Sequence, residues 1–153
     1  MREADLAVLA GFDAVWQRVQ QGKSNAEENR QMQWGELLQG MYDQWKWLGD
    51  LAKCSSGEVR QMLLSLRAEA RRCFCGLQTA CFLDTGDIFV TAETCNFASC
   101  TPYNLRKLYQ NAEKLAGLLQ NASMQEDCAF IVASSAMERQ IVCLRRMIEW
   151  ALQ

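Results

Sequence analysis

Residues 55–87 read SSGEVRQMLLSLRAEARRCFCGLQTACFLDTGD, and this stretch decides the fold. Apolar side chains recur in it three or four positions apart, which is the spacing of one face of an α-helix. The recurring residues are Val59, Met62, Leu63, Leu66, Ala70, Cys73, Phe74, Leu77, Ala80 and Cys81. Ser55-Ser56-Gly57-Glu58 matches a capping box, and the turn residues of 84–87 interrupt the pattern. We therefore predict a helix over residues 56–83.

The preceding segment predicts a second helix over residues 25–53. Its start is marked by a capping box from Ser24 to Glu27, and its apolar residues have the same period. These residues are Trp34, Leu37, Leu38, Met41, Trp45, Leu48 and Leu51. Gly35, Gly40 and Gly49 interrupt the pattern, each at a cost of ~1 kcal/mol relative to Ala. Either the helix tolerates three weak positions, or a neighbouring helix approaches closely at them.

Helical periodicity also appears at both ends of the chain. Residues 2–21 predict a leading helix that stops at Gly22. Thr101 and Pro102 mark the start of another helix, which extends to about residue 121, because Thr is a good N-cap and Pro suits the first helical position. Its inward residues are Leu105, Leu108, Tyr109, Ala112, Leu115, Ala116 and Leu119. Ser123 and Glu126 begin the last helix, whose inward set is Phe130, Ile131, Ser134, Met137 or Glu138, Ile141, Leu144 and Ile148.

The long connection over residues 84–101 lacks a helical period, and Ile88-Phe89-Val90 within it could be extended. It is too long for a tight helical hairpin, so we expect it to cross from one end of a bundle to the other. The sequence thus predicts a single all-α domain over residues 1–153. The leading helix lies in 1–22, the first hairpin in 25–83, the crossover in 84–101 and the second hairpin in 102–152. This is a four-helix bundle with an extra N-terminal helix.

Composition excludes several chemistries. The net charge is −2 with both signs scattered, so we expect neither nucleic acid nor a membrane as partner. No apolar run reaches the ~20 residues of a spanning helix, and the acidic start is unlike a signal peptide, so we expect a cytoplasmic protein. The chain has no histidine, which excludes Ser-His and Cys-His nucleophilic pairs and mixed Cys/His zinc sites. Most of the eight cysteines are expected to be core thiols.

Two stretches of the 56–83 segment and its end resemble a motif of a known protein family. They are LRAEARRC at residues 66–73 and LQTACFLDTG at residues 77–86. Together they resemble the second helix of ferritin-like proteins, especially the rubrerythrin-type proteins of anaerobic bacteria, in which Glu-x-x-His precedes an apolar run ending in Thr-Gly. The resemblance covers residues 25–152 and implies a ferritin-like four-helix bundle. In that family, a Glu from each of two helices and a Glu-x-x-His from each of the others hold two iron atoms.

The ligand positions that the resemblance implies carry other residues here. The second-helix motif falls on Ala70 and Cys73, or on Glu69 and Arg72 if shifted by one position. The last-helix motif falls on Glu138 and Ile141, and the single-glutamate positions fall at 40–43, best matched by Met41, and near Ala112. A di-iron centre needs carboxylates and imidazoles, so we expect no metal and no cofactor.

Two carboxylates remain as metal candidates, Glu69 and Glu138. A buried Glu138 would need a partner such as Arg72 or Arg145, whereas a Glu138 at the bundle's edge would lie in water. The leading functional prediction is a non-catalytic bundle that acts as an interaction or structural protein, as a homodimer or with a protein partner. Exposure of Trp45 or Trp47, which lie on different faces of one helix, would mark such a contact.

The cysteines supply an alternative from a different class. Cys95 and Cys100 lie in the crossover, where they could form a disulfide or half of a thiolate metal site. Cys73 and Cys75 point to different faces of a helix and cannot readily share a metal. A thiol-based redox or metal-binding protein is therefore the second hypothesis. A bundle that holds a non-standard metal or cofactor, as an enzyme would, is the third.

Overall fold

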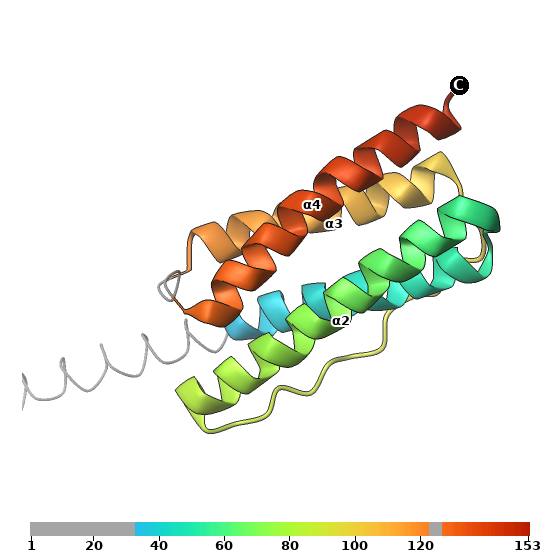
Figure 1. The fold of residues 1–153 in the computed structure, drawn as a ribbon. Coiled ribbons are helices and arrows are strands. Elements are labelled where there is room, and N and C mark those ends of the chain that lie inside the picture. Colours follow the sequence, from blue (N-terminus) through green and yellow to red (C-terminus); the bar gives the residue numbers. More distant parts are fainter. Residues whose placement is uncertain (1–32, 123–126) are drawn as a thin grey trace, which may run out of the picture. The chain divides into compact units, whose positions relative to one another are not determined.

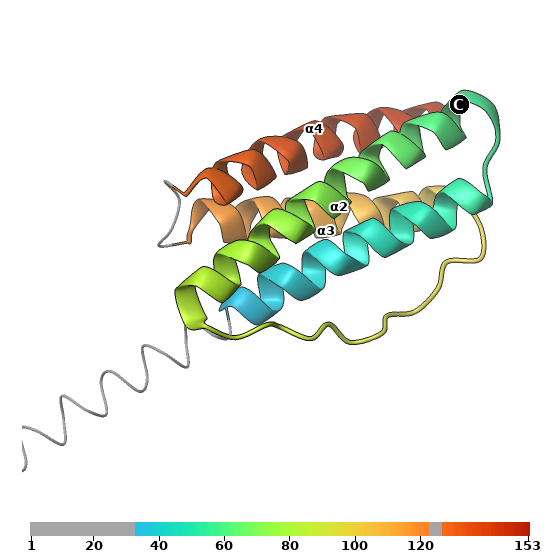
Figure 2. The same cartoon turned by 60° about the horizontal axis from the view of Figure 1, so that its bottom comes forward.

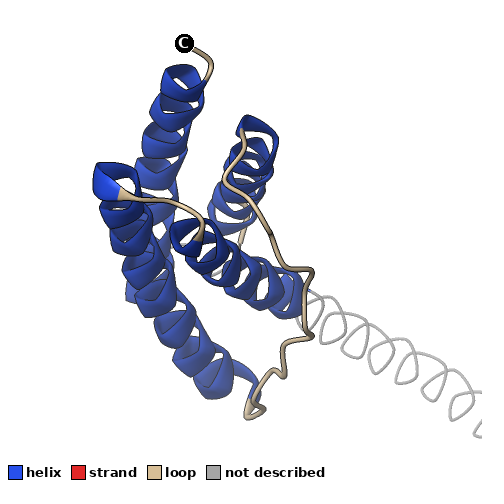
Figure 3. Cartoon of the chain, turned by 90° about the vertical axis from the view of Figure 1, so that its right-hand side faces the viewer, coloured by secondary structure: helices blue, strands red, loops and turns tan. Residues whose placement is uncertain are grey.

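The computed structural model describes residues 33–122 and 127–153, and residues 34–153 make up one compact unit. The described residues form four helices: residues 33–53, α2 (Gly57–Thr85), α3 (Pro102–Gln120) and α4 (Cys128–Ala151). Everything else described is loop or turn (Figure 3). The protein is therefore an all-α four-helix bundle. The leading helix predicted over 2–21 and the capping boxes at Ser24 and Ser123 lie outside the described residues.

The helices pair as two hairpins. The 33–53 helix and α2 are joined by a short turn, and α3 packs against α4 (Figures 1 and 2). The loop between α2 and α3 runs the length of the bundle beside the first hairpin, which confirms the predicted crossover. No described helix has the length and apolar character needed to cross a membrane.

Side chains of the 33–53 helix hold the crossover in place. Gln39 exchanges two hydrogen bonds with the backbone of Ala92, at 3.0 and 2.8 Å. The indole Nε1 of Trp47 donates to the Cys95 carbonyl at 2.9 Å, and Asp50 accepts from the Phe97 amide at 3.1 Å. These side chains satisfy backbone groups of Ala92, Cys95 and Phe97, and residues 88–90 form no strand.

The start of α2 differs from the prediction. Ser55 does not cap it, because its hydroxyl donates instead to the Leu51 carbonyl of the preceding helix at 2.7 Å. The N-cap is Ser56, which makes no side-chain capping bond, so the predicted capping box is wrong. At the other end Gly86 adopts a left-handed φ of 79° and its amide bonds to the Phe82 carbonyl. Gly takes this conformation without strain and ends α2 after Thr85, two residues later than predicted.

The core follows the predicted apolar faces with two corrections. Met62 and Ile131, predicted to point inward, are 45% and 53% exposed. In α4 the buried face is rotated from the predicted one and includes Ala133 and Gln140. A small alanine gives a weaker apolar signal than isoleucine, and a polar glutamine gives none, which is why the periodicity selected Ile131 instead.

Gly40 marks a close approach between helices. A Cβ atom at this position would lie 2.7 Å from Cδ2 of Leu115, a completely buried residue of α3. Of the two interpretations of the interrupting glycines, close approach is the one that holds at Gly40. The absence of a side chain there lets α3 pack directly on the backbone of the 33–53 helix.

Candidate functional site

A polar cluster lies at the centre of the bundle. Gln44 and Gln140 are both 0% exposed and are the only polar side chains classed as buried among the described residues. Gln44 Nε2 donates to Gln140 Oε1 at 3.0 Å. Asn111 Nδ2 donates to Gln44 Oε1 at 3.0 Å and to the Gly40 carbonyl at 2.9 Å. One amide thus connects α3 to the first helix, and the next connects the first helix to α4.

The cluster continues to the surface through α2. Gln140 Nε2 donates to the Leu66 carbonyl at 3.0 Å and to Glu69 Oε1 at 3.4 Å. Glu69 Oε2 accepts from Nη2 and Nε of Arg139, at 2.9 and 3.1 Å. We call this set the amide layer: Asn111, Gln44, Gln140, Glu69 and Arg139. Every one of the four described helices contributes to it.

No buried side-chain polar atom of the amide layer lacks a hydrogen bond. Unpaired buried polar groups cost free energy, so a buried network is stable only if each member has a partner. Among the described residues the one buried side-chain polar atom without a hydrogen bond is Oε1 of Gln78, which lies outside the layer. Each buried amide of the layer therefore has at least one hydrogen-bond partner inside the protein.

The same region offers little to a cation. Amide oxygens are neutral, and the one carboxylate, Glu69, is already bound by Arg139. Burial, and secondarily the charge of Glu69, raises the pKa of the Cys73 thiol to about 11, which disfavours the thiolate form that a metal would bind. Within residues 33–122 and 127–153 no three His, Cys, Asp or Glu side chains come together as a metal site would require.

The remaining family-implied positions are apolar or exposed. Met41, Ala70 and Ala112 are buried in the core, and Ile141 is partly buried. Glu138 is exposed and lies at the edge of the bundle. Neither arginine considered as its partner pairs with it, since Arg145 approaches Glu149 at 4.0 Å and Arg72 makes no ion pair among the described residues. Glu69 is thus paired with Arg139, whereas Glu138 forms no ion pair among the described residues.

The cysteines are dispersed. Cys95 is exposed and Cys100 partly buried, and both are free thiols in this structure, so the pair forms no disulfide here. Cys73 is buried while Cys75 is exposed, as expected for two faces of one helix. Burial also raises the pKa of Cys81. The thiol-based function itself stays a prediction.

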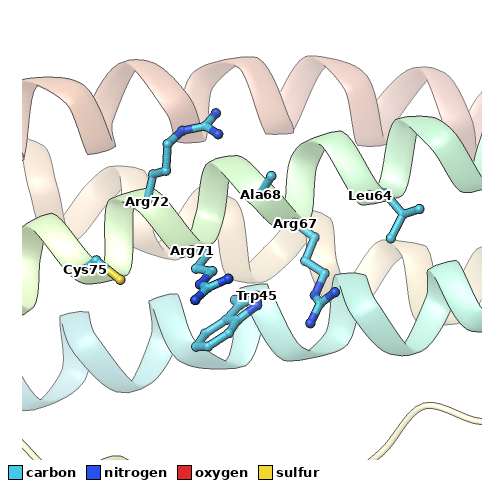
Figure 4. Close-up of a pocket in the computed structure, with 7 residues that line it drawn as sticks. All are labelled: Trp45, Leu64, Arg67, Ala68, Arg71, Arg72 and Cys75. Atoms are coloured by element: carbon cyan, nitrogen blue, oxygen red, sulfur yellow. The ribbon is translucent and has the colours of Figure 1, made fainter.

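A second feature is a surface groove that the sequence analysis missed. It has a volume of about 390 Å³ and lies beside α2, which contributes every lining residue except Trp45 (Figure 4). Its lining is Trp45, Leu64, Arg67, Ala68, Arg71, Arg72 and Cys75. The available signal was the spacing of Arg60, Arg67 and Arg71, which places three cations on one helical face.

Comparisons assign no family to the chain. No protein-family model, curated protein or solved structure matches it. What stands is the all-α four-helix bundle with its two hairpins, the amide layer at its centre and the arginine-lined groove on its surface.

Proposed function

We propose that this chain is a non-catalytic, ferritin-like helical bundle that acts as an interaction or structural protein. In this proposal the amide layer replaces the di-iron centre of the family that the sequence resembles. The protein would then act through surface contacts with a partner and not through a metal bound in its core.

One observation carries the proposal. Each inward member of the amide layer is a sequence neighbour of an implied ligand position. Gln44 directly follows 40–43, Glu69 precedes Ala70, Asn111 precedes Ala112 and Gln140 precedes Ile141. Four side chains from four helices thus meet inside the bundle, beside the positions that the resemblance implies for metal ligands, and they bind one another.

The physical role of such a layer is specificity. Apolar side chains can pack in several alignments of the helices. A buried amide makes its hydrogen bond only in the alignment that places its partner opposite it. The chain from Asn111 to Glu69 therefore favours one alignment of the four helices over slipped ones. A rigid bundle of this kind suits presentation of a fixed surface to a partner.

Metal analysis of protein from iron-supplemented cells tests the central part of the proposal. The expected result is iron, manganese and zinc far below one atom per chain after purification without chelators. Near-stoichiometric iron would contradict it. A known di-iron protein purified in parallel serves as the control that metal survives the procedure.

The assembly is tested separately. Exposed apolar side chains on the bundle include Leu64, Val142 and Trp150, and such residues are the usual material of a protein contact. Light scattering over a concentration series measures whether the chain forms a homodimer. A dimer would identify the partner as a second copy, and a strict monomer would restrict the proposal to a different protein.

A further inference from the structure

The groove beside α2 brings together positive charge that the chain itself does not neutralise. Arg67, Arg71 and Arg72 are exposed, and none of them forms an ion pair with another described residue. Arg67 and Arg71 are one helical turn apart, an arrangement in which like charges repel. An anion placed between them would remove that repulsion.

The two arginines point to the same side. Figure 4 shows Arg67 and Arg71 directed from α2 toward the helix that carries Trp45, whereas Arg72 points the other way. The guanidinium carbon of Arg71 lies 5.8 Å from the centre of the Trp45 ring. Trp45 is itself held against Phe74 of α2, with ring centres 5.9 Å apart. The aromatic ring thus orients the Arg71 side chain.

Gly49 makes room for Arg67. A Cβ atom at Gly49 would lie 3.0 Å from Nε and 3.3 Å from Cδ of Arg67, closer than ordinary packing allows. Arg67 also lines a second hollow of about 260 Å³, together with Trp45, Lys53 and Lys46. Arg67 therefore lines both hollows, and the second hollow also contains the carboxylate of Asp50.

The shape indicates the size of the occupant. Small-molecule sites enclose most of their ligand, but the arginines, Ala68 and Cys75 of this groove are all exposed. Leu64, 39% exposed, adds an apolar contact beside the charges. Arginine and tryptophan are the residues most enriched at the energetic centres of protein interfaces. A segment of a partner protein fits this surface better than an enclosed metabolite does.

We propose that the groove binds an acidic segment of a partner protein. Its Asp or Glu carboxylates pair with Arg67 and Arg71, for which the planar guanidinium provides two parallel donors. An apolar residue of the same segment contacts Leu64 and Ala68. This inference rests on the proposed function as an interaction protein and names the chemistry of its partner.

The test uses the full-length chain and a fluorescently labelled synthetic helical peptide of alternating Glu-rich and Leu-rich faces. Fluorescence anisotropy at physiological salt measures its binding. We expect saturable binding that Arg67→Gln and Arg71→Gln each weaken roughly tenfold, the loss typical of an interface anchor. Arg145→Gln, an exposed arginine on α4, is the matched control and should leave binding unchanged.

Other outcomes overturn the proposal. Equal binding of a peptide with Gln in place of every Glu would show that carboxylates are not recognised. Equal weakening by Arg145→Gln would show a non-specific charge effect, and tighter binding of a single-stranded oligonucleotide would assign the groove to nucleic acid. Circular dichroism of each variant verifies folding. If the purified protein holds no metal but does not bind the peptide, only the proposal about the groove is wrong. If the protein holds stoichiometric iron, the proposed function is wrong, whether or not the peptide binds.

Discussion

The side-chain amides of Gln44 and Gln140 meet inside the bundle, with Nε2 of the first 3.0 Å from Oε1 of the second. The two residues are 96 positions apart and belong to different hairpins. Their hydrogen bond therefore joins the two hairpins at a point where every other neighbouring core side chain is apolar or belongs to the same polar chain. Because the bond forms in only one alignment of the two hairpins, it favours that alignment when they pack together.

Removing one member of this pair should destabilise the fold. Gln44→Leu leaves Oε1 of Gln140 and one donor of Asn111 without their partners, and we expect a loss of about 1–3 kcal/mol in the free energy of unfolding. Urea denaturation measures the loss. Glu138→Gln, an exposed change on α4, is the control and should stay within about 0.5 kcal/mol of the parent.

The double variant Gln44→Leu and Gln140→Leu tests whether the two amides act together. Because their shared bond can be lost only once, the double variant should lose less than the sum of the single losses, with a coupling of about 0.5–3 kcal/mol. Strictly additive losses would mean that the two side chains are energetically independent, against the geometry.

Gly40 and Gly117 should respond oppositely to alanine. Both lie inside helices, where Ala is intrinsically favoured by ~1 kcal/mol. At Gly117 no atom lies within 4 Å of the added Cβ, so Gly117→Ala should stabilise the protein. At Gly40 the added Cβ would lie 2.7 Å from Leu115, so Gly40→Ala should destabilise it by about 1–3 kcal/mol through overpacking. Thermal unfolding of both variants measures the difference.

A smaller residue at position 115 should restore the Gly40 variant. Leu115→Val removes a methylene next to the added Cβ, so in the Gly40→Ala background it should cost less than it does alone. If Gly40→Ala is as stabilising as Gly117→Ala, the close approach of α3 is not present in solution.

Stability should fall at alkaline pH through Cys73. Its pKa is about 11 in the folded state against 9.0 for an ordinary thiol, because burial disfavours the thiolate. Above pH 9 the unfolded chain therefore loses this proton first, binds fewer protons than the folded chain, and is favoured as pH rises. The contribution is fully present below pH 9 and is lost between pH 9 and about 11. Urea midpoints of the parent and Cys73→Ala across this range isolate it, since only the parent includes this slope.

Thiol alkylation should divide the cysteines by burial. Iodoacetamide followed by mass spectrometry should modify the exposed Cys54, Cys75, Cys95 and Cys128 in the native protein. Cys73 and Cys81 should react only after unfolding, because they are buried and their pKa values are raised. Modification of Cys73 at the rate of Cys75 would contradict the packing of α2. An abnormally fast Cys95 would favour the thiol-based alternative.

The fold was predictable where one face of a helix is uniformly apolar. The α2 stripe, apart from Met62, and the α3 stripe from Leu105 to Leu119 were predicted correctly, because leucines at three- and four-residue spacing define one helical face. The N-cap and proline at 101 and 102 placed the start of α3, and Thr101 accepts the predicted hydrogen bond from the Asn104 amide at 3.2 Å. The crossover followed from its length.

The site was not predictable in the same way. A periodicity analysis treats Gln44, Asn111 and Gln140 as surface residues, because a single polar side chain carries no sign of a partner on another helix. The expected centre of apolar and small residues was therefore correct for Met41, Ala70 and Ala112 but missed the amides beside them. The groove was missed because the arginines of α2 were not considered together, and because Trp45 faces them only when the 33–53 helix packs beside α2.

A paramagnetic titration tests the central claim most directly. With the side-chain amides of Gln44, Asn111 and Gln140 assigned by NMR, Mn²⁺ is added to the full-length chain and the loss of each signal is followed. The amide layer predicts that these buried signals persist, because no cation enters a closed hydrogen-bonded centre. Selective loss of the Gln44 and Gln140 signals at stoichiometric Mn²⁺ would contradict it and place a metal site at the core.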